Sequence, residues 1–130
     1  QAQYADLAEN YLADQIYPVG TVLQIGGAAE VSIALEKNPG IVGTVSENPG
    51  YLMNSNLTGE HVTPVAYIGR VPCRVKGIVR RGELLVVSDT PGVATSKDPR
   101  EILPGQLVGK ALQEYTDFGE GLIEILVGRL

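Results

Sequence analysis

The sequence contains few of the residues that most often carry catalysis, metal binding or covalent cross-links. Its 130 residues include one Cys, one His and no Trp. A single Cys excludes an intrachain disulfide and a thiolate metal cluster, and a single His excludes a multi-histidine metal site within one chain. No apolar run approaches the roughly 18 residues that a membrane-spanning helix needs. We therefore expect no metal, no other cofactor and no membrane span.

Glycine and proline are abundant instead, with 16 and 8 residues, and 44% of the chain is hydrophobic. This much Gly and Pro argues against a helical bundle, whereas the content of Val, Ile and Leu argues against disorder. A chain of this length forms one domain, which buries roughly 68% of the surface that is exposed when unfolded. Composition thus predicts one turn-rich β domain and disfavours most enzyme classes.

Short apolar segments bounded by turn residues recur along the chain. The two Asn-Pro-Gly triplets at 38–40 and 48–50 suit tight turns, because Pro presets φ and Gly accepts a positive φ. We expect an all-β fold, an antiparallel sandwich or barrel of about eight short strands. The expected strands are 21–25, 30–35, 41–46, 62–68, 70–76, 83–88 and 122–127, with 107–115 as strand or helix and with 51–60 and 94–105 as loops.

The N-terminal segment is compatible with two conformations. Leu7, Tyr11 and Leu12 recur at the three- and four-residue spacing of a helix, but the same segment also alternates as an extended arm would. We therefore divide the chain into an arm or short helix at 1–16 and a single β-rich domain at 17–130. The first residue is Gln1 rather than Met, which we expect of a processed chain or a piece of a longer one.

Charge is distributed unevenly along the chain. The net charge of −5 argues against nucleic-acid binding. Residues 1–65 hold one base and seven acids, whereas bases gather in residues 70–81. Val71, Cys73 and Val75 alternate there with Arg70, Arg74 and Lys76, which predicts one buried strand face and one basic face. The basic face is solvated, or a seam that pairs with the acid-rich half in the same or a neighbouring chain, or a site that binds an anionic surface ligand.

The segment Val62–Ile68 is apolar on both strand faces, which predicts a central strand or an interface strand. With Val65 and Tyr67 on it, we place this segment at an interface with a neighbouring subunit. Cys73 is interpreted as a small core residue and His61 as a surface residue. A nucleophilic Cys73–His61 pair is conceivable, but no third orienting group is recognisable.

Asp6 and Glu9 are two carboxylates close together among apolar neighbours. Carboxyls that share a site can take different pKa values and act as acid and base. On a helix, the residues i and i+3 would lie on one face, whereas on an extended strand they would point to opposite faces. The alternative to a catalytic role is an acidic surface on an N-terminal arm.

Six motifs in a fixed order resemble a domain at the C-terminal end of tailed-phage structural proteins, especially those of marine and cyanobacterial phages. The resemblance covers about Tyr4 to Leu130 and implies a β-rich terminal domain of a fibre or appendage, normally trimeric. Such domains cap an upstream stalk and set its register. The motifs are Asp6–Tyr11, Tyr17–Leu23, Ile41–Asn54, Val65–Gly77, Arg81–Ala94 and Val108–Leu112.

A more distant resemblance is to the self-cleaving C-terminal domain of phage neck-appendage proteins, which are assigned to a glutamic-peptidase family. It implies an intramolecular chaperone that assembles a trimer and then cuts itself free, with Asp6 or Glu9 in a catalytic role. The start at Gln1 fits a cleaved product, but the sequence departs from the family at Asn10-Tyr11-Leu12. The matching residues are Asp6, Ala8 and Glu9 and, later, Val45, Ser46 and Pro49.

Three hypotheses follow. The first is a virion structural protein, made in the host cytoplasm, that forms a homotrimer, contacts other virion proteins and acts in assembly and host attachment. The second is the self-cleaving chaperone domain. The third is a tip that binds a host surface receptor or glycan through exposed polar loops, with Asn54, Asn56, Lys97 and Arg100 as the contacts.

Overall fold

The computed structural model describes residues 5–128, in which the chain forms ten β-strands and one 3-10 turn. The all-β fold predicted from the turn pattern is confirmed, with ten strands rather than about eight. No helix in this range is long and apolar enough to cross a membrane. The elements are β1 (Asp6–Leu12), β2 (Val22–Ile25), β3 (Val31–Ile33), β4 (Ile41–Thr44), β5 (Tyr51–Met53), β6 (Val62–Lys76), β7 (Leu84–Val87), β8 (Ala94–Ser96), η1 (Pro99–Glu101), β9 (Gly109–Ala111) and β10 (Glu120–Val127).

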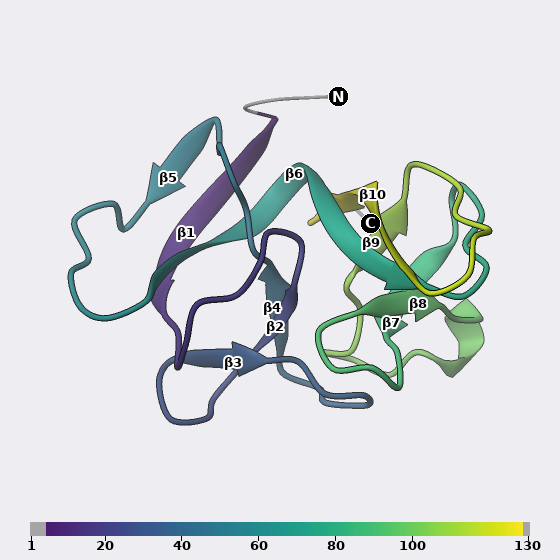
Figure 1. Cartoon of the computed structure of the whole chain (residues 1–130), viewed down its shortest axis with the longest axis horizontal. Coiled ribbons are helices and arrows are strands. Elements are labelled where there is room, and N and C mark those ends of the chain that lie inside the picture. The colour runs from purple at the N-terminus through teal and green to yellow at the C-terminus, as the bar shows by residue number, and fades with distance from the viewer. Residues whose placement is uncertain (1–4, 129–130) are drawn as a thin grey trace.

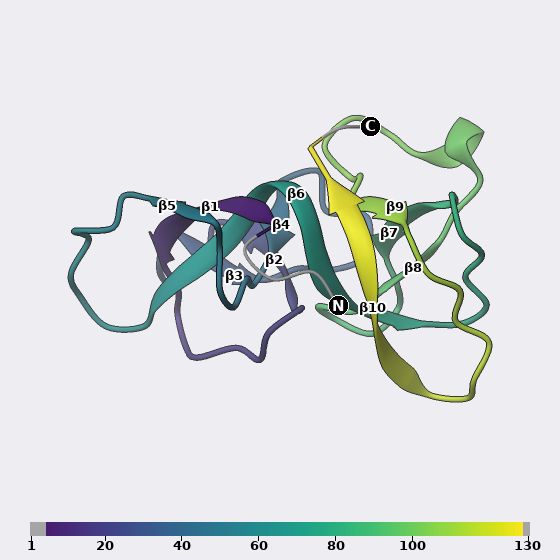
Figure 2. The same cartoon turned by 90° about the horizontal axis from the view of Figure 1, so that it is seen from above.

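The large sheet closes on itself at one end of the molecule. Its strand order is β10-β9-β7-β8-β6-β1-β5, and an additional pairing of β10 with β6 closes a five-stranded barrel from β6 to β10. Strands β1 and β5 extend the other half of β6 outside the barrel. Figure 1 shows β6 crossing from this open end to the barrel end, and Figure 2 shows the two ends side by side from above.

Strand β6 is a single strand of 15 residues where the sequence predicted two. Its N-terminal half pairs with β1 and its C-terminal half pairs with β10. Gly69, at the change of partner, has φ +117° and lies so close to β1 that a Cβ there would overlap the carbonyl oxygen of Ala5. Glycine is the residue that meets both conditions. Gly69, which lies between the two predicted strands 62–68 and 70–76, is therefore a joint within one continuous strand.

The barrel core is lined as the alternation along β6 predicted. Val71, Cys73 and Val75 are buried, together with Leu85 of β7 and Ile125 of β10. The positions between them on β6 carry the basic face. The predicted buried and basic faces of 70–76 are confirmed.

A smaller sheet, of order β3-β2-β4, packs against the open end of the large sheet. Leu23 of β2, Val31 of β3 and Val45, just after β4, form a second core with Val65 of β6. The chain then crosses the large sheet between β4 and β5, which Figure 1 shows passing over β6. Two hydrophobic cores thus lie on one shared strand.

The N-terminal segment is extended, as one of its two alternatives predicted, and forms strand β1 between β6 and β5, so the helix alternative is wrong. Two further expectations about local structure were also wrong. The expected loops 51–60 and 94–105 contain the short strands β5 and β8, and 94–105 also holds η1. Not all pairings are antiparallel, since β1 with β5 and β6 with β8 run parallel. These elements depend on pairing with distant segments, which local patterns do not report.

Candidate functional site

Cys73 and His61 form no nucleophilic pair. Cys73 is fully buried in the barrel core, and burial raises the pKa of its thiol to about 12. His61 stands just ahead of β6, twelve positions before Cys73 along extended chain that advances roughly 3.3 Å per residue. Within residues 5–128, no group of three His, Cys, Asp or Glu side chains could hold a metal ion.

Asp6 and Glu9 do not share a site, because β1 is extended and three positions apart means opposite faces. Glu9 accepts a hydrogen bond from the Tyr11 hydroxyl at 3.2 Å, on the face that carries Leu7 and Tyr11. Burial raises the pKa of Tyr11, and the charge of Glu9 adds to the shift. The shared-carboxylate arrangement therefore does not form in this conformation.

Asp6 has a more distinctive environment than Glu9. The Ser46 hydroxyl donates to Asp6 Oδ2 at 2.8 Å, and the Gly50 amide donates to the Asp6 carbonyl at 2.8 Å. Burial beneath the crossing chain raises the pKa of the Asp6 carboxyl, and the Ser46 hydrogen bond partly offsets that shift. A shallow cleft of about 450 Å³, lined by Asp6, Gly50 and Gly69 among others, opens beside it. Asp6 is thus a half-buried carboxyl that retains access to solvent.

The Asp6–Ser46 contact joins the two motifs of the neck-appendage resemblance. The matched residues lie 40 positions apart in sequence, so spacing alone gave no reason to place them together. Ser46 reaches Asp6 because the chain leaves β4, hydrogen-bonds to Pro64 of β6 and crosses over to β5. Reasoning from single residues proposed neither Ser46 as a partner of Asp6 nor Tyr11 as a partner of Glu9.

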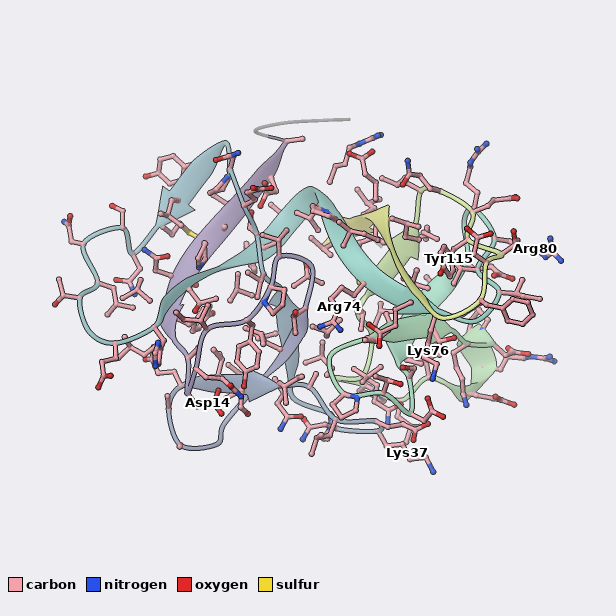
Figure 3. The ribbon with its side chains drawn as sticks, viewed as in Figure 1. Asp14, Lys37, Arg74, Lys76, Arg80 and Tyr115 are labelled. Carbon is pink, nitrogen blue, oxygen red and sulfur yellow. The ribbon has the colours of Figure 1, made fainter. Side chains whose placement is uncertain are left out.

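The bases of the basic face form ion pairs with acids of their own half of the chain. Arg70 pairs with Glu124 at 3.1 Å and Arg74 with Glu120 at 2.7 Å, each two positions diagonal to its direct neighbour on β10. Lys76 pairs with Asp89 at 2.8 Å. Arg74 also donates to the Thr21 hydroxyl at 3.2 Å. Figure 3 labels Arg74 and Lys76. Among the described residues, these three bases therefore form no ion pair with an acid of residues 1–65 of the same chain.

The two apolar residues proposed for an interface have different surroundings. Val65 is only 1% exposed, because the chain's own second core covers it, so a neighbouring subunit does not reach it. Tyr67 is 62% exposed and stands where the β1–β6 register shifts. Of these two residues, only Tyr67 is exposed enough to contact a neighbouring subunit.

The polar residues proposed for receptor binding lie in two separate loops. The loop with Asn54 and Asn56 is at the open end and that with Lys97 and Arg100 at the barrel end, as both cartoons show. Asn54 exchanges hydrogen bonds with Asn10, at 3.1 and 3.4 Å. Arg100 pairs with Asp98 at 2.8 Å. The four side chains therefore do not form one site, and at least two of them have structural partners.

A pocket that the sequence did not reveal lies where the β3–β4 turn meets the segment after β8. Val86, Val87 and the exposed Leu103 are its apolar lining residues, and the exposed Lys37 and Lys97 are among the charged residues of its rim. Its volume is about 310 Å³. Gln106 connects the walls, since its side chain donates to the Lys37 carbonyl at 3.1 Å and accepts from the Leu103 amide at 3.0 Å. We call this site the Lys37–Lys97 pocket.

No protein-family model matches the sequence, and no curated protein matches it. Among solved structures, the C-terminal fragment of gene product 12 of bacteriophage phi29 is similar, with a TM-score of 0.69 at 15% identity. The match covers 94% of this chain and 99% of that fragment. The pre-mature phi29 gene product 12 is similar over 97% of this chain and 22% of its own length, with a TM-score of 0.71 at 16% identity. At such identities the likeness establishes a shared fold.

Proposed function

We propose that this chain is the C-terminal structural domain of a phage fibre or appendage, and that it acts in assembly as a homotrimer. The observation that carries the proposal is the fold match, which covers nearly all of this chain and nearly all of the C-terminal fragment of phi29 gene product 12. The six ordered motifs of the sequence point to the same class of protein. Fold alone does not determine function, so the agreement of motifs and fold is what favours this class over others.

The position of the first described residues suits a domain that receives an upstream stalk. Ala5 accepts a hydrogen bond from Arg70 at 3.1 Å and leads directly into β1, an inner strand of the large sheet. Chain that precedes Ala5 would therefore connect to the middle of the domain rather than to a peripheral arm. Such a connection can fix the register of three stalk chains against three domains.

Two measurements test the proposal. Light scattering of the purified chain is expected to give a mass three times the 13.8 kDa of one chain. Mass spectrometry of purified particles and assembly intermediates of a phage that encodes the chain is expected to detect its peptides. A monomer at the highest attainable concentration would contradict the trimer, and absence from both particles and intermediates would contradict the virion role.

A second candidate function, one-time cleavage of its own chain, is favoured by the Asp6–Ser46 contact. A carboxyl with a raised pKa can exchange protons nearer to neutral pH than a solvated one can, and a shallow cleft that is open to solvent lies beside Asp6. Glu9 lies on the opposite strand face, so this candidate assigns the proton-transfer role to Asp6 and none to Glu9.

Expression with the native upstream segment tests this candidate by the appearance of a shorter band on a denaturing gel. We expect Asp6→Asn to abolish the shorter band and Ser46→Ala to slow its appearance. Glu9→Gln is the matched control, and we expect it to cleave like the wild type. An uncut wild-type chain sinks the second candidate and leaves the structural role intact.

A further inference from the structure

The chain's only Phe is displayed completely to solvent. Phe118, in the turn between β9 and β10, has a relative exposure of 103%, the highest of the exposed large hydrophobic residues. Scattered exposed apolar residues are ordinary on protein surfaces. Phe118 differs from these because hydrogen bonds from another side chain hold the backbone of its turn. We call residues 115–119 the Phe118 turn.

Tyr115 holds the Phe118 turn in place. Its hydroxyl donates to the carbonyl oxygens of Phe118 at 3.2 Å and Gly119 at 3.3 Å. Its backbone exchanges two hydrogen bonds of 2.9 Å with Val79, and its ring packs so tightly on Gly121 that no Cβ would fit there. A partner that binds Phe118 therefore has little loop entropy to remove. Aromatic anchors presented in this way are typical of the residues that dominate interfaces.

The Lys37–Lys97 pocket has the size and lining to receive one aromatic side chain. Its lining includes the apolar residues Val86, Val87 and Leu103, its volume is about 310 Å³, and Gln106 connects the two walls. The rim carries charges, as the rims of protein interfaces do. Phe118 of the same chain does not occupy it, because Phe118 is fully exposed. Figure 3 shows Lys37 and Tyr115 at separate places on the molecule.

We propose that Phe118 of one copy inserts into the Lys37–Lys97 pocket of a second copy, and that repetition of this contact closes the homotrimer. The inference rests on the proposed trimeric function and names its contact surfaces. A cyclic trimer needs two different complementary patches on each chain, whereas a two-fold dimer needs one patch that matches itself. The Phe118 turn and the pocket are two such patches, on different elements of the chain.

Charge favours this occupant over an unrelated apolar ligand. Asp117, next to Phe118, and Lys37, on the rim, are both exposed, and within residues 5–128 no ion pair joins either to another residue. Lys97 and Glu101 on the same rim pair with each other at 3.7 Å. Glu36 is the remaining rim acid, so the docked turn must place Asp117 on the Lys37 side. This requirement sets one orientation of the turn in the pocket.

Sedimentation of the whole chain and of its variants tests the contact. We expect Phe118→Ala to weaken trimer association by about 30-fold or more, as loss of an interface anchor does. Ile16→Ala is the matched control, because Ile16 is another strongly exposed apolar residue, with 78% exposure, that the contact does not use. Circular dichroism and unfolding midpoints must match the wild type, so that a loss of association is not a loss of fold.

A mixing experiment distinguishes this contact from a self-matching one. Leu103→Asp replaces an exposed apolar residue of the pocket lining with a charge, so it should disable the pocket and leave Phe118 intact. At concentrations where each variant alone is monomeric, an equimolar mixture of Leu103→Asp with Phe118→Ala should form a complex of two chains. Lys37→Glu and Asp117→Lys should each weaken the trimer, and the double variant should recover most of the loss.

The outcomes separate the inference from the proposal on which it rests. A wild-type trimer that persists unchanged in Phe118→Ala, or a mixture that stays monomeric, overturns the contact and leaves the trimer standing. A wild-type monomer overturns both. Dissociation by Phe118→Ala and Leu103→Asp but not by Ile16→Ala, together with pairing in the mixture, supports the contact.

Discussion

The two ends of the molecule are stabilised in different ways. At the barrel end, strands β6 to β10 close a sheet around an apolar core that includes Leu85 and Ile125. At the open end, a smaller core is supplemented by polar links between segments. The Tyr17 hydroxyl donates to Asp14 at 2.6 Å and accepts from the Ile33 amide at 3.2 Å, and Ser46 donates to Asp6. At the barrel end the polar links are largely ion pairs, such as Arg74 with Glu120 at 2.7 Å and Lys76 with Asp89 at 2.8 Å, whereas at the open end they are hydrogen bonds made by hydroxyl groups.

The two ends also differ in the direction in which the pKa values of their acidic residues are shifted. Burial raises the pKa of Asp6 at the open end. At the barrel end, hydrogen bonds from backbone or side-chain donors lower the pKa of Glu83, Asp89 and Asp98. The three acids of the barrel end are therefore stabilised in their ionised form, whereas Asp6 of the open end is half-buried beneath the chain that connects β4 to β5. Burial of the Asp6 carboxyl disfavours its charged form, and carboxyls with a pKa shifted in this way are often found at functional sites.

The largest expected effect is on the joint between the ends. Gly69→Ala places a Cβ against Ala5 in a backbone conformation with φ +117°, and we expect a loss of about 4 kcal/mol of unfolding free energy. Gly82→Ala is the matched control, because Gly82 also has a positive φ but open space around it. That control should lose only about 1 kcal/mol. Equal losses in urea titrations of the two variants would show that collision at the joint is unimportant.

The next effect asks whether the two ends unfold together. Leu85→Ala in the barrel core and Leu23→Ala in the second core each remove a fully buried side chain, and each should cost about 3 kcal/mol. Because β6 belongs to both ends, we expect one transition that both substitutions shift. The chain has no Trp and six Tyr, so tyrosine fluorescence and circular dichroism can follow it. Two separate transitions, with Leu23→Ala moving only one, would contradict a shared unit.

A smaller effect compares one hydroxyl from each end. Tyr17→Phe removes a hydrogen bond to a carboxylate at a nearly buried position, and we expect a loss of about 1.5 kcal/mol. Tyr115→Phe removes bonds to two exposed carbonyls, and we expect a loss of about 0.5 kcal/mol. Thermal or urea unfolding measures both. The reverse order would mean that polar links matter more at the barrel end than at the open one.

The smallest effect is a difference in pH dependence. Since the pKa of Asp6 is raised in the folded state, its contribution to stability is complete below the ordinary value of 3.8 and is lost as pH rises through the folded value. The lowered pKa values of Glu83, Asp89 and Asp98 act oppositely, since their contribution is lost as pH falls. Asp6→Asn removes only the first. We expect urea midpoints to shift in favour of the wild type, relative to Asp6→Asn, as pH falls from about 7 to about 3.

Local sequence predicted most of the strands that end in turn residues. The segments around β2, β3 and β4 were found because Gly and Pro bound them, and the inward face of 71–75 because apolar and basic residues alternate. Strands β5 and β8 were missed because each has three residues and exists through pairing with a distant partner. The N-terminal segment was ambiguous for the same reason, since β6 and β5, rather than its own propensities, make it a strand.

The candidate site was less predictable than the strands. Spacing drew attention to Asp6 and Glu9 together, but an extended strand separates them, and the partner of Asp6 comes from 40 positions away. The Lys37–Lys97 pocket is lined by one segment that precedes β6 in the sequence and by others that follow it, so no short sequence motif could have predicted it. Phe118 could have been noted as an apolar residue in a Gly-rich turn, but only the Tyr115 contacts show that the turn is held.

The continuous strand β6 also has a mechanical consequence. Chain that precedes Ala5 enters β1, which runs antiparallel to the N-terminal half of β6 and is hydrogen-bonded to it over its whole length. A pull on that entry along the strand would load these bonds in shear, all at once, rather than peel them one by one. The same pull would pass through Gly69 into the closed barrel, so tension applied at one point would be shared by the whole domain.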